Sequence, residues 1–258
     1  MYKSLSLSAL TAFLLFLMVT LTGAQGTPTI TQQVTYRETI KRFVTFDPAQ
    51  AQLLSPLEKE GLSRQSETRR VTQSVDQQQN VSTRIVIENT DVYEPWMRPT
   101  RTILNDQNGL ALWDDKNQVK YFAPHTGADL EAYNQLKQSI AQDGLLPGKS
   151  FVVPTAAQLA QLRTQGAVVN VLPGGQYSIQ TEGQTHLYDP VNLSVNIQIS
   201  EQGRLATELY QRYVSLEGRN VPSVKIEKTF ETLNSGVCIT RVEYTLYDQY
   251  QINRPASR

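Results

Sequence analysis

The sequence predicts an α+β protein that is mainly antiparallel β. Apolar and polar residues alternate along most of the chain, and from 193 to 200 every odd position is aliphatic while every even position is Ser, Asn or Gln. Turn signals recur at the spacing of an antiparallel sheet. Helical periodicity is confined to a short turn near residue 56 and to two segments between 126 and 166. We therefore expect one sheet, or two, with two short helices covering its apolar side.

Residues 1–24 have the features of a secretory signal. Lys3 precedes an apolar run at about 10–21, and small residues lie one and three places before Gln25, which predicts cleavage after Ala24. The alternative is an uncleaved membrane anchor, but the run is shorter than the roughly 20 apolar residues that a span needs. No later stretch is long enough to cross a membrane as a helix. We expect an exported protein, either periplasmic or extracellular and on the cell surface.

Charge and cysteine content narrow the class of protein. The chain has 24 basic and 24 acidic residues, so no general attraction to nucleic acid or anionic lipid is expected. Cys238 is the only cysteine, which excludes an internal disulfide. It lies in a strand pattern, where we expect a buried, inert thiol. A Gln-rich exported chain with so few cysteines is typical of the bacterial envelope.

The first part of the mature chain, 25–125, reads as mainly β. A long alternating segment, 30–46, is followed by a short helix in which Ser55 and Glu58 fit a capping box. The polar segment 62–80 fits either a mobile loop or a solvent-facing strand. Alternation returns in 81–87. Three short strands around the turn signal Asn108-Gly109 complete this part.

The second part, 126–258, begins with two helices. The first is expected from Thr126 to Gly144. In the second, Thr155 and Gln158 form a capping box, and Leu159 and Leu162 make the inward face. From 167 to the end the pattern is a series of hairpins. The boundary between the two parts is weak, so they form either two domains or one.

The last hairpins resemble those of the periplasmic lipoprotein-carrier proteins of the LolA/LolB type. The matching residues, all beyond Gln184, are Gly218, Val221, Pro222, Val224, Ile226, Val242, Tyr244, Tyr247, Tyr250 and Asn253. The resemblance implies a curved, incomplete barrel with helices over its concave apolar side, while the strand pattern itself also allows a curved sheet or a sandwich. The resemblance also implies an acyl chain as the ligand. No ligand residue carries over by position, because the first half of the chain has no match.

Candidates for catalysis are few. The chain has two histidines, His125 and His186, and only His186 has a phenol and a carboxylate nearby, at Tyr188 and Asp189. We expect ordinary surface or edge-strand imidazoles. No zinc-ligand spacing, calcium loop or serine-hydrolase elbow is present. We therefore expect no enzyme activity, no catalytic residues, no metal and no cofactor.

The function expected from these features is that of an exported, non-catalytic, β-rich envelope protein. It would bind an apolar small molecule or another envelope protein, and no nucleic acid. Its expected contact residues are Tyr93, Trp96 and Met97 of a proline-bounded loop, together with Leu193, Val195, Ile197, Val242, Tyr244 and Leu246 of one apolar concavity. The alternatives are a structural or assembly subunit of an envelope complex, and a secreted hydrolase with an unrecognised site.

Overall fold

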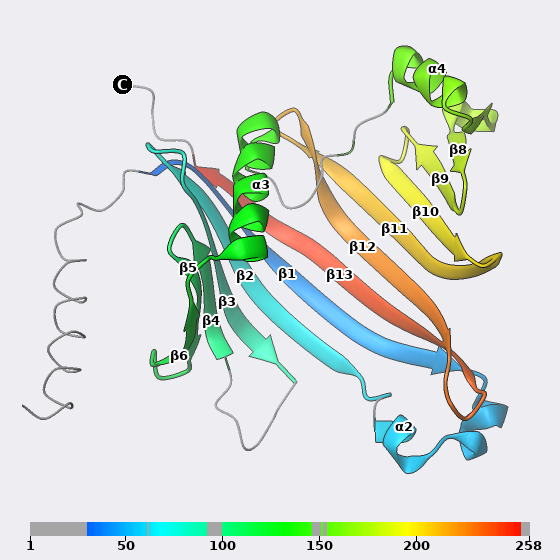
Figure 1. The fold of residues 1–258 in the computed structure, drawn as a ribbon, viewed down its shortest axis with the longest axis horizontal. Coiled ribbons are helices and arrows are strands. Elements are labelled where there is room, and N and C mark those ends of the chain that lie inside the picture. Colours follow the sequence, from blue (N-terminus) through cyan, green and yellow to red (C-terminus); the bar gives the residue numbers. More distant parts are fainter. Residues whose placement is uncertain (1–29, 61, 92–99, 146–150, 152–153, 254–258) are drawn as a thin grey trace, which may run out of the picture.

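The computed structural model describes residues 30–60, 62–91, 100–145, 151 and 154–253 (Figure 1). The expected signal sequence and the loop residues Tyr93, Trp96 and Met97 lie outside these ranges. Among the described residues, no helix is long and apolar enough to cross a membrane.

Thirteen strands form one open antiparallel sheet, which confirms the expected fold class. The strand order is β6-β5-β4-β3-β2-β1-β13-β12-β11-β10-β9-β8-β7. The strands are β1 (Ile30–Phe46), β2 (Gln65–Asp76), β3 (Val81–Thr90), β4 (Thr100–Asp106), β5 (Gly109–Asp114), β6 (Val119–Ala123), β7 (Val168–Val171), β8 (Tyr177–Thr181), β9 (Gln184–Asp189), β10 (Ser194–Glu201), β11 (Arg204–Leu216), β12 (Arg219–Thr232) and β13 (Cys238–Asn253).

The two parts of the chain meet at the centre of this sheet. β1 pairs with β13, from Gln33 opposite Asn253 to Phe46 opposite Ile239. The polar segment 62–80, for which the sequence allows either a loop or a strand, contains β2. This strand pairs with the other edge of β1. Segments 25–125 and 126–258 therefore each contribute about half of one continuous sheet.

The helices are short. They are the 3-10 turns η1 (Pro48–Leu53) and η2 (Pro173–Gly175) and the α-helices α2 (Pro56–Glu60), α3 (Gly127–Asp143) and α4 (Ala156–Thr164). α3 crosses in front of β1 and β2, and α4 lies at the far end of the sheet beside β8 (Figure 1). The capping box expected at Thr155 and Gln158 is present.

Strand register assigns every side chain to one of two faces, because directly opposed residues point the same way. We call the face that carries Tyr36 and Val71 the inner face, and the opposite one the outer face. α3 packs on the inner face through Tyr133, Leu136 and Ile140. One row of opposed residues runs along the inner face from β1, under α3, to β8, beside α4. Its members are Ile40, Thr245, Lys225, Gln211, Val195, Tyr188 and Tyr177.

α4 packs on the same face. Its Leu159 and Leu162 contact the cluster of Ala167, Tyr177 and Ile179. The apolar clusters of the described residues thus all lie on the inner face, where helices and Phe151 cover them. The expectation that the sheet buries its apolar side under its own helices is met at both ends of the sheet.

The two edge strands are short and partly protected. β6 has five residues, carries Lys120 and is followed by Pro124. β7 has four residues, and the Arg163 guanidinium of α4 donates to the Val169 carbonyl at 3.5 Å. Short length, lysine and proline all discourage an edge from pairing with another chain.

Cys238 corrects one sequence-based expectation. The thiol is free and exposed, whereas its neighbours Val237 and Ile239 are 0% and 3% exposed. Alternation along β13 puts residue 239 on the covered side and residue 238 on the other. The strand pattern correctly predicted the strand, but the residue was assigned to the wrong face.

Glu58 ties α2 to the turn between β12 and β13. Its carboxylate accepts from the Ser55 backbone N–H at 2.8 Å and from the Ser235 backbone N–H at 3.2 Å. These hydrogen bonds, those from Ser55 foremost, lower the pKa of Glu58 to about 2. The stability they provide is therefore complete above the ordinary carboxyl pKa and is lost as the pH falls towards 2.

Glu58→Gln should accordingly change the pH dependence of stability. We expect the wild type to be more stable than the variant at pH 7, and this difference to shrink steadily between pH 5 and pH 2. Urea unfolding curves of both proteins at several pH values measure it. An equal difference at pH 7 and pH 3 would contradict the assignment.

Candidate functional site

The expected contact residues of β10 lie in a packed cluster. Val195 is 5% exposed and groups with Phe151 and Tyr213, while Leu193 and Ile197 pack against it half-buried. Tyr188 joins this cluster to the one under α4, so the Leu159/Leu162 helix lies nearby as expected. These side chains line none of the cavities described below.

Val242, Tyr244 and Leu246 lie on the outer face, which corrects the expectation that they share one concavity with β10. The row that starts at Leu246 continues through Val224 and Arg212 to Ser194. Ser194 precedes Val195 on the strand and so points to the opposite side. The two sets of contact residues therefore belong to different surfaces.

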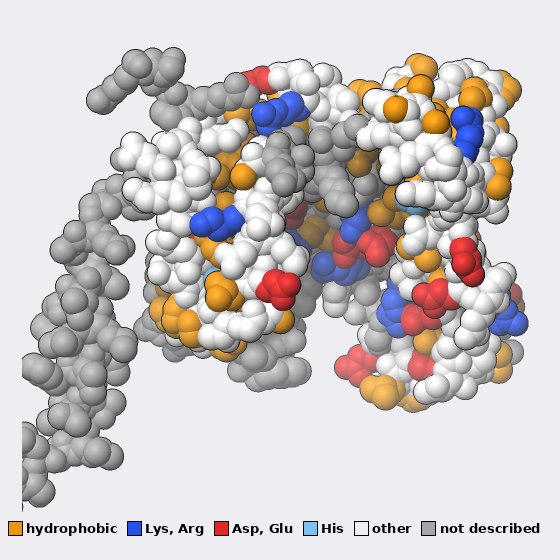
Figure 2. Space-filling model, turned by 45° about the horizontal axis from the view of Figure 1, so that its top comes forward, with side chains coloured by type: hydrophobic (Ala, Val, Ile, Leu, Met, Phe, Trp, Pro, Cys, Tyr) orange, Lys and Arg blue, Asp and Glu red, His pale blue; other side chains and the backbone are white. Residues whose placement is uncertain are grey.

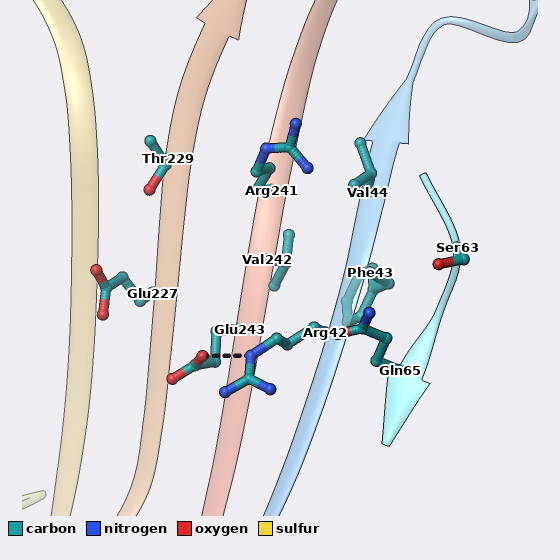
Figure 3. A pocket seen from close by; sticks show the side chains of 10 residues that line it. All are labelled: Arg42, Phe43, Val44, Ser63, Gln65, Glu227, Thr229, Arg241, Val242 and Glu243. Carbon is teal, nitrogen blue, oxygen red and sulfur yellow. Dashed lines mark hydrogen bonds and ion pairs between the residues drawn. The ribbon is translucent and has the colours of Figure 1, made fainter. Parts of the chain in front are cut away.

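The inner face is hollow between the part of the sheet that carries α3 and the part that carries α4. Figure 2 shows this hollow, with basic and acidic side chains gathered in it. A cavity of about 320 Å³ lies over β1, β13 and β12. Its charged lining residues are Arg42, Glu227, Arg241 and Glu243. In Figure 3, Arg42 reaches from β1 to Glu243 on β13.

Ion pairs cross four adjacent strands at this level, and we call them the charged floor. Its members are Glu67 and Arg69 of β2, Glu38 and Arg42 of β1, Arg241 and Glu243 of β13, and Lys225, Glu227 and Glu231 of β12. Arg42 contacts Glu243 at 2.8 Å, Lys225 contacts Glu227 at 2.7 Å, and Arg69 contacts Glu67 at 2.9 Å. Arg241 also pairs with Glu231.

Burial affects the charged floor unevenly. Glu38 is well covered, and this desolvation raises its pKa, against the opposing effect of Arg69 at 3.5 Å. With four basic and five acidic groups, the floor carries almost no net charge. Such a surface suits a neutral or zwitterionic polar group better than a hydrocarbon chain.

Sequence reasoning missed the charged floor, although its signal is visible. Glu38 and Arg42 interrupt the apolar parity of β1, and Arg241 and Glu243 form the polar parity of β13. Charges of this kind normally mark a solvent-facing side. The pairing of β1 with β13 places them on the same face as the core residues Tyr36 and Ile239.

A second cavity, of about 250 Å³, lies between α3 and strands β4 to β6, and we call it the α3 groove. Its apolar lining is Leu110, Tyr121, Ala123, Ala132, Tyr133 and Leu136, and its polar lining is Asn105, His125 and Asp129. Tyr133 anchors the helix here, since its hydroxyl donates to the Val81 carbonyl at 2.9 Å and accepts from the Val81 N–H at 3.2 Å. Lys137 adds a bond to Asn80 at 3.2 Å.

The histidines pair with amides. His125 lies 2.9 Å from the Asn105 side-chain oxygen and stacks on Tyr133 with ring centroids 5.0 Å apart. His186 lies 3.3 Å from the Gln184 side-chain oxygen, and burial lowers its pKa. Both are half-buried.

The sequence neighbours His186, Tyr188 and Asp189 do not form one cluster. His186 and Tyr188 point to the inner face, whereas Asp189 is opposite Ser194 on the outer face. Its carboxylate accepts from the backbone N–H and side chain of Asn192, at 2.9 and 2.7 Å, which holds its pKa below the usual range. Within the described part of the chain, no three His, Cys, Asp or Glu side chains are grouped as metal ligands.

Solved structures with a similar chain path exist. A DUF1329 family protein from Desulfovibrio piger matches with a TM-score of 0.40 and 8% identity, covering 89% of this chain and 88% of that one. A putative outer membrane lipoprotein-sorting protein domain from Vibrio parahaemolyticus matches with a TM-score of 0.38 and 11% identity, covering 88% and 87%. The likeness is one of fold. No family model and no curated protein matches the sequence.

The resemblance to lipoprotein-carrier proteins was expected for the residues after Gln184, and the aligned part of the Vibrio domain covers 88% of this chain. The first half supplies strands β1 to β6 of the same sheet, although its sequence has no recognisable match.

Proposed function

We propose that this protein is a non-catalytic binding protein of the cell envelope that holds an amphiphilic molecule on its inner face. The observation that carries the proposal is the α3 groove, an apolar cavity bounded by a helix and rimmed by polar groups. Pockets for small molecules are typically apolar with a few polar groups that fix orientation. The groove has this composition.

The ligand class follows from volume and charge. A cavity of about 250 Å³ lies below the range of pockets that enclose a whole small molecule, which is roughly 300–1,000 Å³. It therefore suits the apolar part of a ligand whose polar part stays outside. His125, Asp129 and Asn105 at the rim offer hydrogen bonds to that polar part.

The proposal of a binding role, and not a catalytic one, has two supports. The hydrogen bonds of both imidazoles go to amides, and the carboxylate next to His186 in sequence faces the other side of the sheet. An envelope location is proposed from the signal-like residues 1–24.

Binding of a dansyl-labelled undecanoic acid to the purified full chain tests the groove. We expect saturable fluorescence enhancement for the wild type. Ala132→Trp places a large ring in the groove and should weaken the affinity at least tenfold. Ala141→Trp is the matched control, because residues nine apart lie on opposite sides of a helix, and it should bind as the wild type does.

Two results would contradict the proposal. One is equal affinity of Ala132→Trp and wild type. The other is the absence of saturable binding together with no lipid in solvent extracts of the chain purified from its host. The second result would favour a structural or assembly role.

A further inference from the structure

A continuous apolar surface crosses the outer face at the centre of the sheet. Three neighbouring rows of opposed residues form it: Thr39, Leu246, Val224 and Arg212; Lys41, Tyr244, Ile226 and Tyr210; and Phe43, Val242, Lys228 and Glu208. Its seven apolar members, Phe43, Val224, Ile226, Tyr210, Val242, Tyr244 and Leu246, are called the outer patch. It includes the three β13 residues that the sequence singled out as contacts.

The described part of the chain leaves the outer patch uncovered. Each of its side chains is half-buried. α3, α4 and Phe151 all pack on the inner face. A contiguous, uncovered apolar patch on a solvent-exposed face typically marks an interaction site.

The two faces of the central strands differ in charge. In the block where β2, β1, β13, β12 and β11 pair, the charged floor on the inner face has four basic and five acidic residues. On the outer face, five basic residues stand against three acidic ones when the β3 partner of Arg70 is included: Arg37, Lys41, Arg70, Arg212 and Lys228 against Glu88, Glu208 and Asp248. The outer face is thus net +2 and the inner face net −1.

Two of these cations flank the outer patch without an acidic partner among the described residues. Arg37 pairs with Asp248, Lys228 with Glu208 and Arg70 with Glu88 of β3, each at 2.8 Å. Lys41 is opposite Tyr244 and Arg212 is opposite Val224, and both are exposed. An apolar centre with unpaired cations at its sides calls for a partner of the opposite charge.

We propose that the outer patch docks an acidic protein surface with an apolar centre. Aromatic side chains and arginine are enriched in protein interfaces, and the patch has Tyr210, Tyr244 and Phe43 beside Arg212. A second copy docked through the same patch would bring two faces of net +2 together. A membrane surface is disfavoured, because anionic lipid recognition uses clusters of about four to eight cations and, of the described cations in this block, only Lys41 and Arg212 have no ion-pair partner. The surface is separate from the α3 groove.

Site-specific photo-cross-linking in the host envelope tests the assignment. A benzoylphenylalanine in place of Ile226 probes the outer patch in the full chain. The same group in place of Thr229, exposed on the inner face of the same strand, is the control. We expect one acidic protein to be cross-linked from position 226 and not from position 229.

The captured protein is then identified by mass spectrometry, purified and measured against the full chain. The double variant Lys41→Glu/Arg212→Glu should weaken its binding at least tenfold, and added salt should narrow that gap. Lys59→Glu/Arg163→Glu changes the net charge equally on exposed positions of α2 and α4, away from the patch, and should leave the affinity unchanged.

Other outcomes would overturn the proposal. These are cross-linking of position 226 to a second copy of the chain, equal cross-linking from both positions or none from 226, and affinity unaffected by Lys41→Glu/Arg212→Glu. Binding of the wild type, but not of this variant, to phosphatidylglycerol vesicles in the absence of a protein partner would assign the patch to a membrane instead.

Discussion

Replacing Tyr36 with alanine is expected to lower the free energy of unfolding by about 3–5 kcal/mol, as for other large aromatic residues truncated in a core. Tyr36 is 5% exposed and lies on β1 at the centre of the sheet. Its ring stacks on Tyr250 at 5.6 Å and lies 6.2 Å from Tyr247, both on β13. The change removes this three-ring contact between the two ends of the chain and leaves a cavity. Urea unfolding at pH 7 measures the loss.

Tyr121→Ala provides the matched control. This tyrosine is 52% exposed on the edge strand β6, so its truncation should cost less than about 1 kcal/mol. Equal costs at the two positions would mean that the β1–β13 seam is not the stability centre that the packing indicates.

Gly109→Ala is expected to destabilise the protein by at least about 3 kcal/mol, through backbone strain and overpacking together. Gly109 has a φ of +141°, and an added Cβ would lie 2.1 Å from the Ala123 carbonyl oxygen and 2.8 Å from the Pro124 Cα. Both neighbours are backbone atoms of the adjacent strand or its end, so β6 must move away from β5. Unfolding curves report the cost, and loss of probe binding would report damage to the α3 groove, which Ala123 lines.

Gly218→Ala is the control that separates the cost of backbone strain from the cost of steric overlap with β6. Gly218 also has a positive φ, +77°, but an added Cβ there would meet nothing within 4 Å. Its replacement should cost only the left-handed conformation, about 1–2 kcal/mol. If both variants lose the same stability, contact with β6 contributes nothing and the expected difference is refuted.

The physical character of the inner face differs from the one expected. An apolar concavity was expected, and the structure has apolar clusters under α3, under Phe151 and under α4, with a charged floor on the open part of β2, β1, β13 and β12. The clusters are sealed by α3, by Phe151 and by α4, so the sheet's own helices occupy the surfaces that a purely apolar ligand would need. The α3 groove is an apolar cavity that stays open on this face, and the cavity over the charged floor is polar, which is why the proposed ligand is an amphiphile.

Most strands were predictable because they are long enough to show their own period. The segment 193–200 alternates cleanly, the segment 30–46 alternates with interruptions at Glu38 and Arg42, and both form strands where expected. The helix ends at Ser55 and Thr155 were predictable for a local reason, since a capping box is completed within four residues. The sequence did not decide whether β2 is a strand or a loop, because most of its residues are polar and show no apolar alternation. Only its pairing with β1 and β3 distinguishes it from a loop.

The sequence by itself determined which residues of a strand share a face, because side chains alternate with a fixed period of two. Only the tertiary structure decided which face of one strand joins which face of the next. Which faces join depends on the pairing register of the strands, and irregularities such as those at Thr35/Arg37 and Arg212/Tyr213 shift this register. It also depends on the pairing of β1 with β13, more than 190 residues apart in sequence. For this reason the apolar parities of β10 and β13, alike in sequence, lie on opposite sides of the sheet.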